Sequence, residues 1–325
     1  MNCCRTKQKR INHGSLGVSL PIISLSISML LVFCSVATVT SAEEQEKEKE
    51  LLRYAGRICL QTGNNLLNVL SDRQRDALFS PLFSIPSRGI RVESLPVFVV
   101  EPIENPRDWN AYAQLTNQGS LCTVLTNEMV KSLYQFAKIQ VLQPPERHNE
   151  LADALASHIA KGEDLGQLSV GLTPASKEAV DRACGYLASG LVAHEFAHLY
   201  LGHIGSALTE EGFSATSSKE EINAKLKKLA HREKEMEADL AALDNAIRVH
   251  PNMVVGMLYT YDFMTRVEEK MGASDLPEVL LDHPHAKTRV GYLLNRLETV
   301  HRMNVAAVFP SWFLTKYEYQ PGQRG

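Results

Sequence analysis

The stretch VDRACGYLASGLVAHEFAHLYL, residues 180–201, decides how the rest of the sequence is interpreted. Its apolar residues and two histidines recur at spacings of three and four, which places them on one face of an α-helix. That face carries Val180, Cys184, Leu187, Leu191, His194, His198 and Leu201. The pattern predicts a central helix over Pro174–Ile204.

This helix contains the sequence H-E-x-x-H, which stands here as HEFAH at residues 194–198. Two histidines four residues apart lie one turn apart, so both imidazoles reach one zinc ion at about 2.0–2.1 Å. Glu195 lies at the edge of that face, where its carboxylate reaches a water in the open coordination position. We therefore predict His194 and His198 as zinc ligands and Glu195 as the general base. The alternative is a core helix with two hydrogen-bonded histidines.

A third ligand is expected, because a catalytic zinc takes three protein ligands and leaves one position open. Glu235 lies in the next strong helical pattern, across one polar linker, and two antiparallel helices joined in this way bring it against the histidines. Asp239 follows one turn later on the same face, where it accepts a hydrogen bond from His194. Taken alone, Glu235 would also suit a solvated surface of this charged helix.

The segment DHPHAKTR, residues 282–289, places a histidine and an arginine around a helix that begins after a proline. Peptide hydrolysis needs a cation or a hydrogen-bond donor for the tetrahedral oxyanion. His283 and Arg289 are predicted for that role. The alternative is a helix N-terminus with a surface arginine.

The remaining pattern is mostly helical, with two expected strands at Ile90–Glu101 and Ser120–Thr126. Ser218 and Glu221 form a capping-box pair, so a helix is expected from there to about His250. The other expected helical stretches are Glu43–Ser80, Asn127–Leu142, Glu146–Lys161, Asn252–Met271 and Ala286–Met303.

The N-terminus has the layout of an export signal. Residues 5–10 carry four basic side chains, residues 16–39 are mostly apolar, and charge returns at Glu43. This pattern predicts a signal peptide or signal anchor over residues 1–42 and places the rest across the membrane, in the periplasm or on the outer face of the cytoplasmic membrane. The membrane is a partner if the segment is uncleaved. An organelle intermembrane compartment stays open.

Composition narrows the class of protein. The 34 basic and 37 acidic side chains give a net charge of −3, and nucleic-acid binding, which favours a basic excess, is not expected. Hydrophobic residues make up 44% of the chain, as in a globular core. The cysteines beyond the signal are Cys59, Cys122 and Cys184, an odd number without a CxxC motif, so a disulfide scaffold is not expected.

Together the motifs resemble those of the HtpX-like zinc metallopeptidases, which include the CAAX prenyl endopeptidases and their single-pass or periplasmic relatives. HEFAH (194–198), EMEAD (235–239) and HPHAKTR (283–289) occur in that family's order. Asn110–Ala113, followed by SLCTVLTNEMV (120–130), is similar to the segment and edge strand that precede the active helix in the family.

The resemblance implies a helix-rich α+β, zincin-like fold of the gluzincin type, with a small antiparallel sheet packed against the H-E-x-x-H helix. It implies that His283 and Arg289 contact the substrate or the transition state. It also implies that an edge strand holds an extended or unfolded polypeptide as an added strand. The residues of that strand are Ser120, Leu121, Cys122, Thr123 and Val124.

The expected domains are an N-terminal helical segment, 43–94, and a zinc metallopeptidase domain, 95–325. Residues 137–189 look longer than usual for the family and are a possible lid or insertion. His203 lies about 140° beyond the ligand face of a continuous helix, so it is not expected to bind the metal.

These patterns predict an endopeptidase with one zinc per chain, in which Glu195 assists the attack of zinc-bound water on envelope proteins, with protein quality control as its task. The first alternative is a latent or non-proteolytic zinc-binding assembly or chaperone-like factor. A structural zinc would have four protein ligands, commonly cysteines, and Glu195 argues against that reading. The second alternative is a helical envelope protein with a chance motif.

Overall fold

The computed structural model describes residues 42–78, 97–101, 111–115, 121–163, 173–203, 217–275 and 284–319. They belong to one compact unit, Ala42–Gly325. Apart from Ala42, the expected export signal lies outside the described residues. Among the helices that are described, none combines the length and the apolar character needed to cross a membrane.

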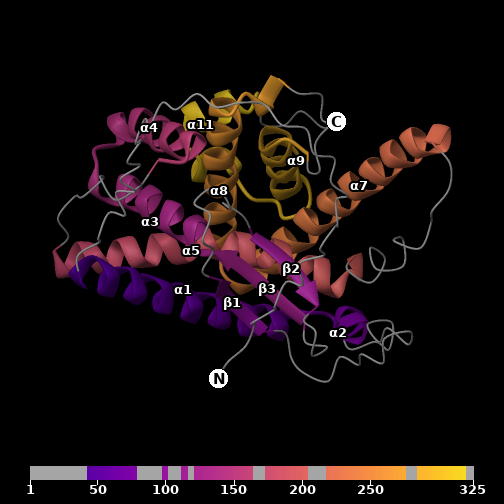
Figure 1. Cartoon of the computed structure of the whole chain (residues 1–325), viewed down its shortest axis with the longest axis horizontal. Coiled ribbons are helices and arrows are strands. Elements are labelled where there is room, and N and C mark those ends of the chain that lie inside the picture. The colour runs from indigo at the N-terminus through magenta and orange to yellow at the C-terminus, as the bar shows by residue number, and fades with distance from the viewer. Residues whose placement is uncertain are drawn as a thin grey trace, which may run out of the picture. The chain divides into compact units, whose positions relative to one another are not determined.

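The described chain is built mainly from helices (Figure 1). In chain order the elements are α1 (Ala42–Val69), α2 (Asp72–Leu78), β1 (Val97–Glu101), β2 (Ala111–Leu115), β3 (Leu121–Thr126), α3 (Asn127–Leu142), α4 (His148–Lys161), α5 (Pro174–Tyr200), α7 (Ser217–Val249), α8 (Pro251–Lys270), α9 (Ala286–Thr299), α10 (Val305–Val308) and α11 (Ser311–Lys316), with short 3-10 turns at Pro145–Arg147 and Ala273–Asp275.

The predicted α+β fold with an antiparallel sheet is wrong. Helices dominate the described residues, and the strands have only five, five and six residues. They pair in the order β1-β3-β2, with β1 parallel to β3 and β2 antiparallel to it. Val97 stands opposite Cys122, and Ala111 stands opposite Leu125. The sequence predicted strands at the positions of β1 and β3 but missed β2, and the two predicted strands pair in parallel.

The helix boundaries follow from local signals in the sequence. α3 and the start of α5 agree with the predicted ranges, and α4 begins two residues late because a 3-10 turn precedes it. At the start of α5 the hydroxyl of Thr173 accepts from the backbone N–H of Ser176, whose own hydroxyl accepts from the N–H of Thr173. Pro174 occupies the first turn, where its missing N–H costs nothing.

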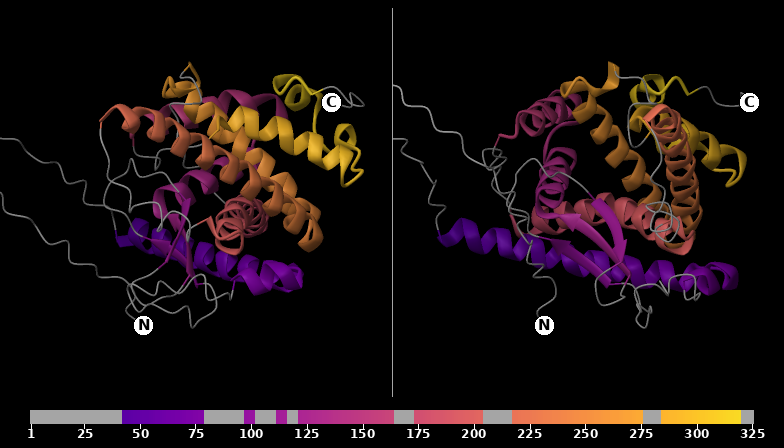
Figure 2. Two further views of the ribbon diagram at one scale, coloured as in Figure 1. Left: turned by 90° about the vertical axis from the view of Figure 1, so that its right-hand side faces the viewer. Right: turned by 45° about the vertical axis from the view of Figure 1, so that its right-hand side comes forward.

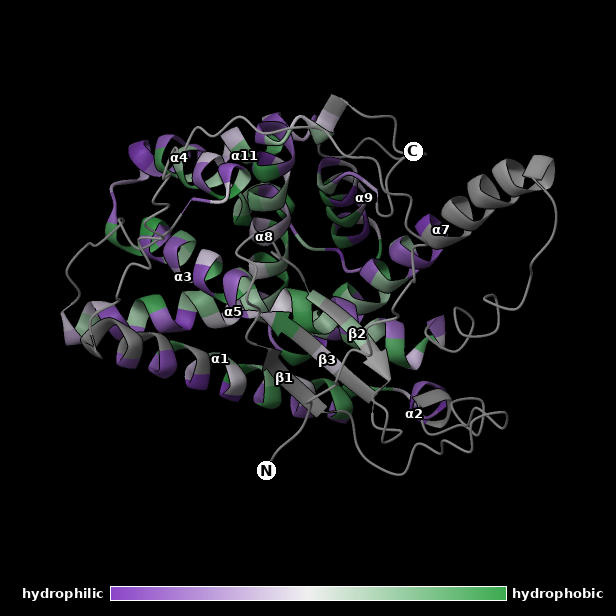
Figure 3. Cartoon of the chain, in the orientation of Figure 1, coloured by the Kyte–Doolittle hydropathy of each residue, from purple (hydrophilic) through white to green (hydrophobic). Residues whose placement is uncertain are grey.

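α5 is the central element of the unit. It contacts α1, α3, α7 and α8, and α1 runs along it while β2 and β3 pack on it as well (Figure 1, Figure 2). From Leu187 to Tyr200 every residue is buried, so this part is covered on all sides and not only on the predicted face. The outer helices α1, α3 and α4 carry hydrophilic and hydrophobic residues in alternation (Figure 3).

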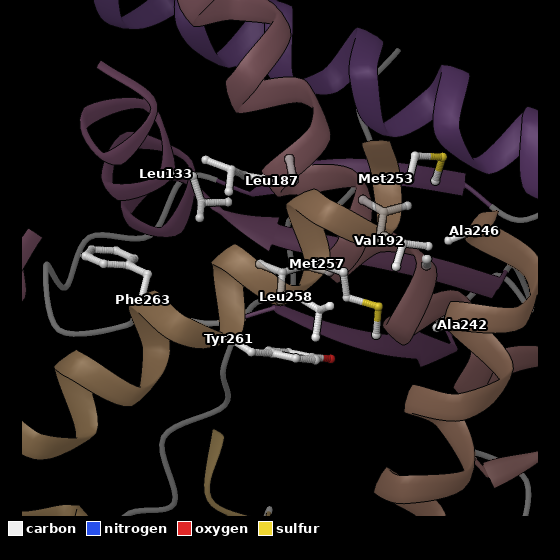
Figure 4. Packing of buried hydrophobic residues seen from close by; sticks show 14 of the residues in the cluster. Leu133, Leu187, Val192, Ala242, Ala246, Met253, Met257, Leu258, Tyr261 and Phe263 are labelled. Carbon is white, nitrogen blue, oxygen red and sulfur yellow. The ribbon is translucent and has the colours of Figure 1, made fainter. Parts of the chain in front are cut away.

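The segments predicted as separate parts belong to the same core. In the described portion of 137–189, the expected lid or insertion, Ala137, Leu155 and Val180 are fully buried, so this portion packs within the unit. Cys59 and Leu66 of α1 are buried as well, so the N-terminal helical segment shares that core. Figure 4 shows side chains of α8, among them Met257 and Leu258, close to those of α5 and α7.

α5 and α8 approach each other through two glycines. A Cβ atom on Gly190 would lie 2.5 Å from Cα of Met257, and one on Gly256 would lie 2.2 Å from the carbonyl oxygen of Tyr186. Neither contact is possible for a real side chain, because backbone atoms cannot move aside as a flexible side chain can. The two helices therefore pack backbone to backbone.

We expect Gly256→Ala to destabilise the protein by about 1–3 kcal/mol or more, because the added methyl forces α5 and α8 apart. Denaturant unfolding followed by circular dichroism measures this. Gly291→Ala in α9 is the matched control: no atom lies within 4 Å of its added Cβ, so it should be neutral or stabilise by up to about 1 kcal/mol. Equal effects of the two substitutions would contradict the close approach.

Cys59 and Cys184 are free thiols in the core. Burial raises the pKa of Cys59 to about 12 and also raises the pKa of Cys184. Only the thiolate is nucleophilic, so iodoacetamide at pH 8 should leave both residues unmodified in the native protein and modify both in urea. Mass spectrometry of peptides reads this out, and rapid native labelling at either position would contradict the packing of α1 on α5.

Candidate metal centre

Helices α5 and α7 bring together the side chains that the sequence predicts as ligands. Nε2 of His194 lies 3.1 Å from Oε2 of Glu235 and 3.1 Å from Nε2 of His198. Nε2 of His198 lies 3.3 Å from Oε1 of Glu235. All three residues are buried. They form a group that could hold a metal ion.

The spacing of these atoms fits a shared cation. In a tetrahedral site with ligands about 2.0–2.1 Å from the ion, neighbouring ligand atoms are about 3.3–3.4 Å apart. The observed separations of 3.1–3.3 Å are close to this value. Two imidazole nitrogens and a carboxylate that face one another in a buried space need either protons or a metal ion between them.

Glu195 is next to this group without being part of it. Its Oε1 lies 4.0 Å from Nε2 of His194, and its side chain is almost completely buried. The three grouped ligand atoms come from His194, His198 and Glu235. The carboxylate predicted as general base therefore lies beside the ligand atoms.

Asp239 lies behind His194, as the sequence predicted. Its Oδ1 is 2.8 Å from Nδ1 of His194 and accepts from the hydroxyl of Tyr261 at 2.6 Å. Its Oδ2 accepts from Nε of Arg289 at 2.7 Å and from the hydroxyl of Tyr292. Asp239 is fully buried, so these donors replace the water that it loses on folding.

The charges of this cluster set the protonation states. Burial raises the pKa of Asp239, but Arg289 and His194 outweigh it and hold that pKa well below its usual range. Burial lowers the pKa of His194, but Asp239, with help from Glu235, raises it to about 10. Burial dominates at His198 and lowers its pKa. Asp239 is therefore ionised, and His198 favours the neutral form that binds metals.

Arg289 has a different environment from the predicted one. It is 4% exposed, and its donors reach both oxygens of Asp239 and the hydroxyl of Tyr261, while its guanidinium lies 4.1 Å above the ring of Tyr261. It also lies against the ring of His194, 3.2 Å from Nδ1. Contact with a transition state remains a prediction. The geometry shows an arginine that neutralises a buried carboxylate.

The predicted substrate-binding strand is not an edge strand. β3, which contains Leu121–Val124, lies between β1 and β2 and pairs with both, so neither of its edges is open to a peptide. The prediction was wrong because β2, which was not expected from the sequence, pairs with the edge of β3 that would otherwise be open. Ser120 and the predicted oxyanion residue His283 lie outside the described residues.

Three residues of the site were missed from the sequence. Tyr261 and Tyr292 bind Asp239, and His203 contacts His198. Tyr292 follows Arg289 at helical spacing, a signal that would have placed it on the same face of α9. Tyr261 lies in a largely apolar helix, and nothing in its local sequence separates it from the core.

Arg289→Ala should destabilise the metal-free protein by about 3–5 kcal/mol, because it leaves the charge of Asp239 buried without its cation. Denaturant unfolding measures the loss. The control is Arg182→Ala on α5, whose ion pair with Glu178 is exposed and should be worth no more than about 0.5 kcal/mol. A double variant with Asp239→Asn should recover part of the stability. Equal losses for both arginines would contradict the network.

Comparison with protein-family models, with curated proteins and with solved structures found no significant match to this chain.

Proposed function

We propose that the chain is a zinc-dependent endopeptidase related to the HtpX-like metallopeptidases. The observation that carries the proposal is the meeting of His194, His198 and Glu235 in one buried group with Glu195 beside it. A chance motif in a helical protein gives no reason for a glutamate of another helix to lie 3.1 Å from the first histidine.

The donor set favours zinc in a catalytic role. Two imidazoles and one carboxylate are a common ligand set of zinc hydrolases, whereas structural zinc sites have four protein ligands and commonly use cysteine. Among the described residues, the metal-binding group consists of these three side chains. Three ligands would leave a coordination position for the reaction.

The proposed reaction is hydrolysis of a peptide bond. Zinc in this group would act as a Lewis acid toward the scissile carbonyl and lower the pKa of a water molecule to about 7. Glu195 takes a proton from that water as its oxygen bonds to the carbonyl carbon. The C–N bond then breaks, and Glu195 passes the proton to the leaving amine nitrogen.

Asp239 orients the first ligand in this scheme. Its carboxylate accepts from Nδ1–H of His194, so loss of the other ring proton on metal binding would leave the lone pair of Nε2 directed toward the metal group. Arg289 holds Asp239 through both carboxylate oxygens. We therefore assign Arg289 a positioning role in addition to the predicted contact with the transition state.

A second candidate is a latent or non-proteolytic zinc-binding factor with an assembly or chaperone-like role. The observation that favours it is burial: Glu195 is 9% exposed, and His194, His198 and Glu235 are 3%, 8% and 1% exposed. In such a latent factor, a polypeptide would reach these groups only after a movement of the surrounding chain. Latency would be one way to protect an envelope from its own protease.

The proposed setting follows from the N-terminal 42 residues. An exported protein would meet extended or unfolded polypeptides of the envelope, and removal of such chains is a task of protein quality control. In this segment the basic residues 5–10 are followed by the mostly apolar residues 16–39, which is the layout of an export signal.

Glu195→Gln tests the proposal, because it keeps a side chain of the same shape without a carboxylate to accept the proton. In the full chain, purified in detergent, the wild type and the variant should each bind one zinc, and casein cleavage should fall by about 10²–10⁴-fold in the variant. Elemental analysis and fluorescent casein read the two quantities.

Glu178→Gln is the matched control, since Glu178 is an exposed glutamate of the same helix. It should retain both zinc and cleavage. Zinc without cleavage in the wild type would favour the latent factor. Absence of zinc from folded wild-type protein would show that the metal proposal is wrong.

A further inference from the structure

His203 reaches the second zinc-ligand candidate because α5 ends before it. The helix stops at Tyr200, and Gly202 adopts a left-handed conformation with φ 75°. Glycine takes this conformation without the clash that a side chain would cause. His203 is thereby turned back toward His198, and the two rings meet edge to face with their centroids 4.9 Å apart.

A chain of hydrogen bonds runs through His203. Nδ1 of His203 lies 2.9 Å from Nδ1 of His198, and Nε2 of His203 lies 3.3 Å from Oε2 of Glu237. Glu237 comes from α7, two residues after the ligand Glu235. The chain therefore joins the turn after α5 to the helix that supplies the third ligand.

The Nδ1–Nδ1 contact has two possible directions. If His198 donates, its Nε2 carries a lone pair and faces Glu235 and His194, which is the state that binds a metal. If His203 donates, Nε2 of His198 carries a proton that points into the ligand group and blocks the metal.

Glu237 selects between these directions. A carboxylate accepts hydrogen bonds and does not donate them, so it favours a proton on Nε2 of His203. Neutral His203 then has a bare Nδ1, and the shared proton sits on Nδ1 of His198. The side chain of His203 is 8% exposed, whereas that of Glu237 is 61% exposed, so the chain leads from the surface to the ligands.

We propose that His203 is a positioning residue: with Glu237 it holds His198 in the tautomer whose Nε2 faces His194 and Glu235, ready for the metal. The proposal deepens the proposed function, because it assumes that these three residues bind the ion. His203 itself is not a ligand, since it meets His198 on the ring nitrogen that does not face Glu235.

Zinc affinity of the full chain, measured at one pH and salt concentration by competition with a chromophoric chelator, is the first test. His203→Leu removes the acceptor and should weaken zinc binding by about 10–100-fold. His203→Asn keeps an acceptor oxygen near the position of Nδ1 and should restore affinity to within a few-fold of the wild type. Glu237→Leu should weaken binding less than His203→Leu, and should have no further effect in the His203→Asn background.

His301→Leu is the matched control, because His301 also binds a carboxylate of α7, Asp244, at 2.7 Å but has no part in the metal group. Its zinc affinity should equal that of the wild type. Circular dichroism confirms that each variant is folded. If His203→Leu binds zinc as tightly as the control, or if His203→Asn binds as weakly as His203→Leu, the positioning role is excluded.

The second test reads the tautomer of His198 in metal-free protein by ¹⁵N NMR of the histidine side chains. We expect the proton on Nδ1 in the wild type and exchange between tautomers in His203→Leu. A proton on Nε2 in the wild type would overturn the proposal. This readout does not depend on cleavage: wild type that binds zinc but cuts no casein would refute the peptidase and leave the positioning role standing. Wild type that binds no zinc would overturn both.

Discussion

The buried carboxylate of Asp239 is the constraint on which the rest of the site depends. A charge removed from water costs several kcal/mol unless hydrogen bonds and an opposite charge replace the solvent. Here the replacements come from other helices: His194 from α5, Tyr261 from α8, and Arg289 and Tyr292 from α9. α7 can bury this carboxylate only when α5, α8 and α9 are all packed against it. The first candidate ligand, His194, is therefore oriented by the assembly of the helical unit and not by α5 alone.

That assembly requires α8 to pack closely against α5. Tyr261 reaches Asp239 from a helix whose backbone touches α5 at Gly190 and Gly256. Side chains at these positions would keep the helices apart and would move the hydroxyl away from the carboxylate that it binds. Two residues with no functional group of their own thus control a hydrogen bond next to His194. The close approach of the α5 and α8 backbones therefore sets the position of the Tyr261 hydroxyl at Asp239.

Local sequence patterns predict some of these features, whereas others depend on contacts between distant parts of the chain. Helical spacing is sufficient to place His194 and Glu235 on faces that meet, because both lie inside long helices where the period of 3.6 residues holds. The strand pairing is not local: β1 pairs in parallel with β3, and β2 takes the other edge, a choice made by packing on α1 and α5. The helical period does not give the position of His203, because α5 ends at Tyr200 and the left-handed Gly202 changes the direction of the chain before His203.

The two histidines of the site are held in different ways, and this difference has a physical consequence. His194 is hydrogen-bonded to Asp239, a carboxylate that is fully buried in the core. Salt therefore screens the charge of Asp239 much less than that of an exposed group. His198 is backed by His203 and, through it, by Glu237, which is largely exposed and therefore screened by salt. The first candidate ligand is fixed by the fold, while the second is held by a chain of hydrogen bonds that ends at an exposed carboxylate. A change at the surface near Glu237 would therefore act on the candidate metal group through His198, while the position of His194 would stay the same.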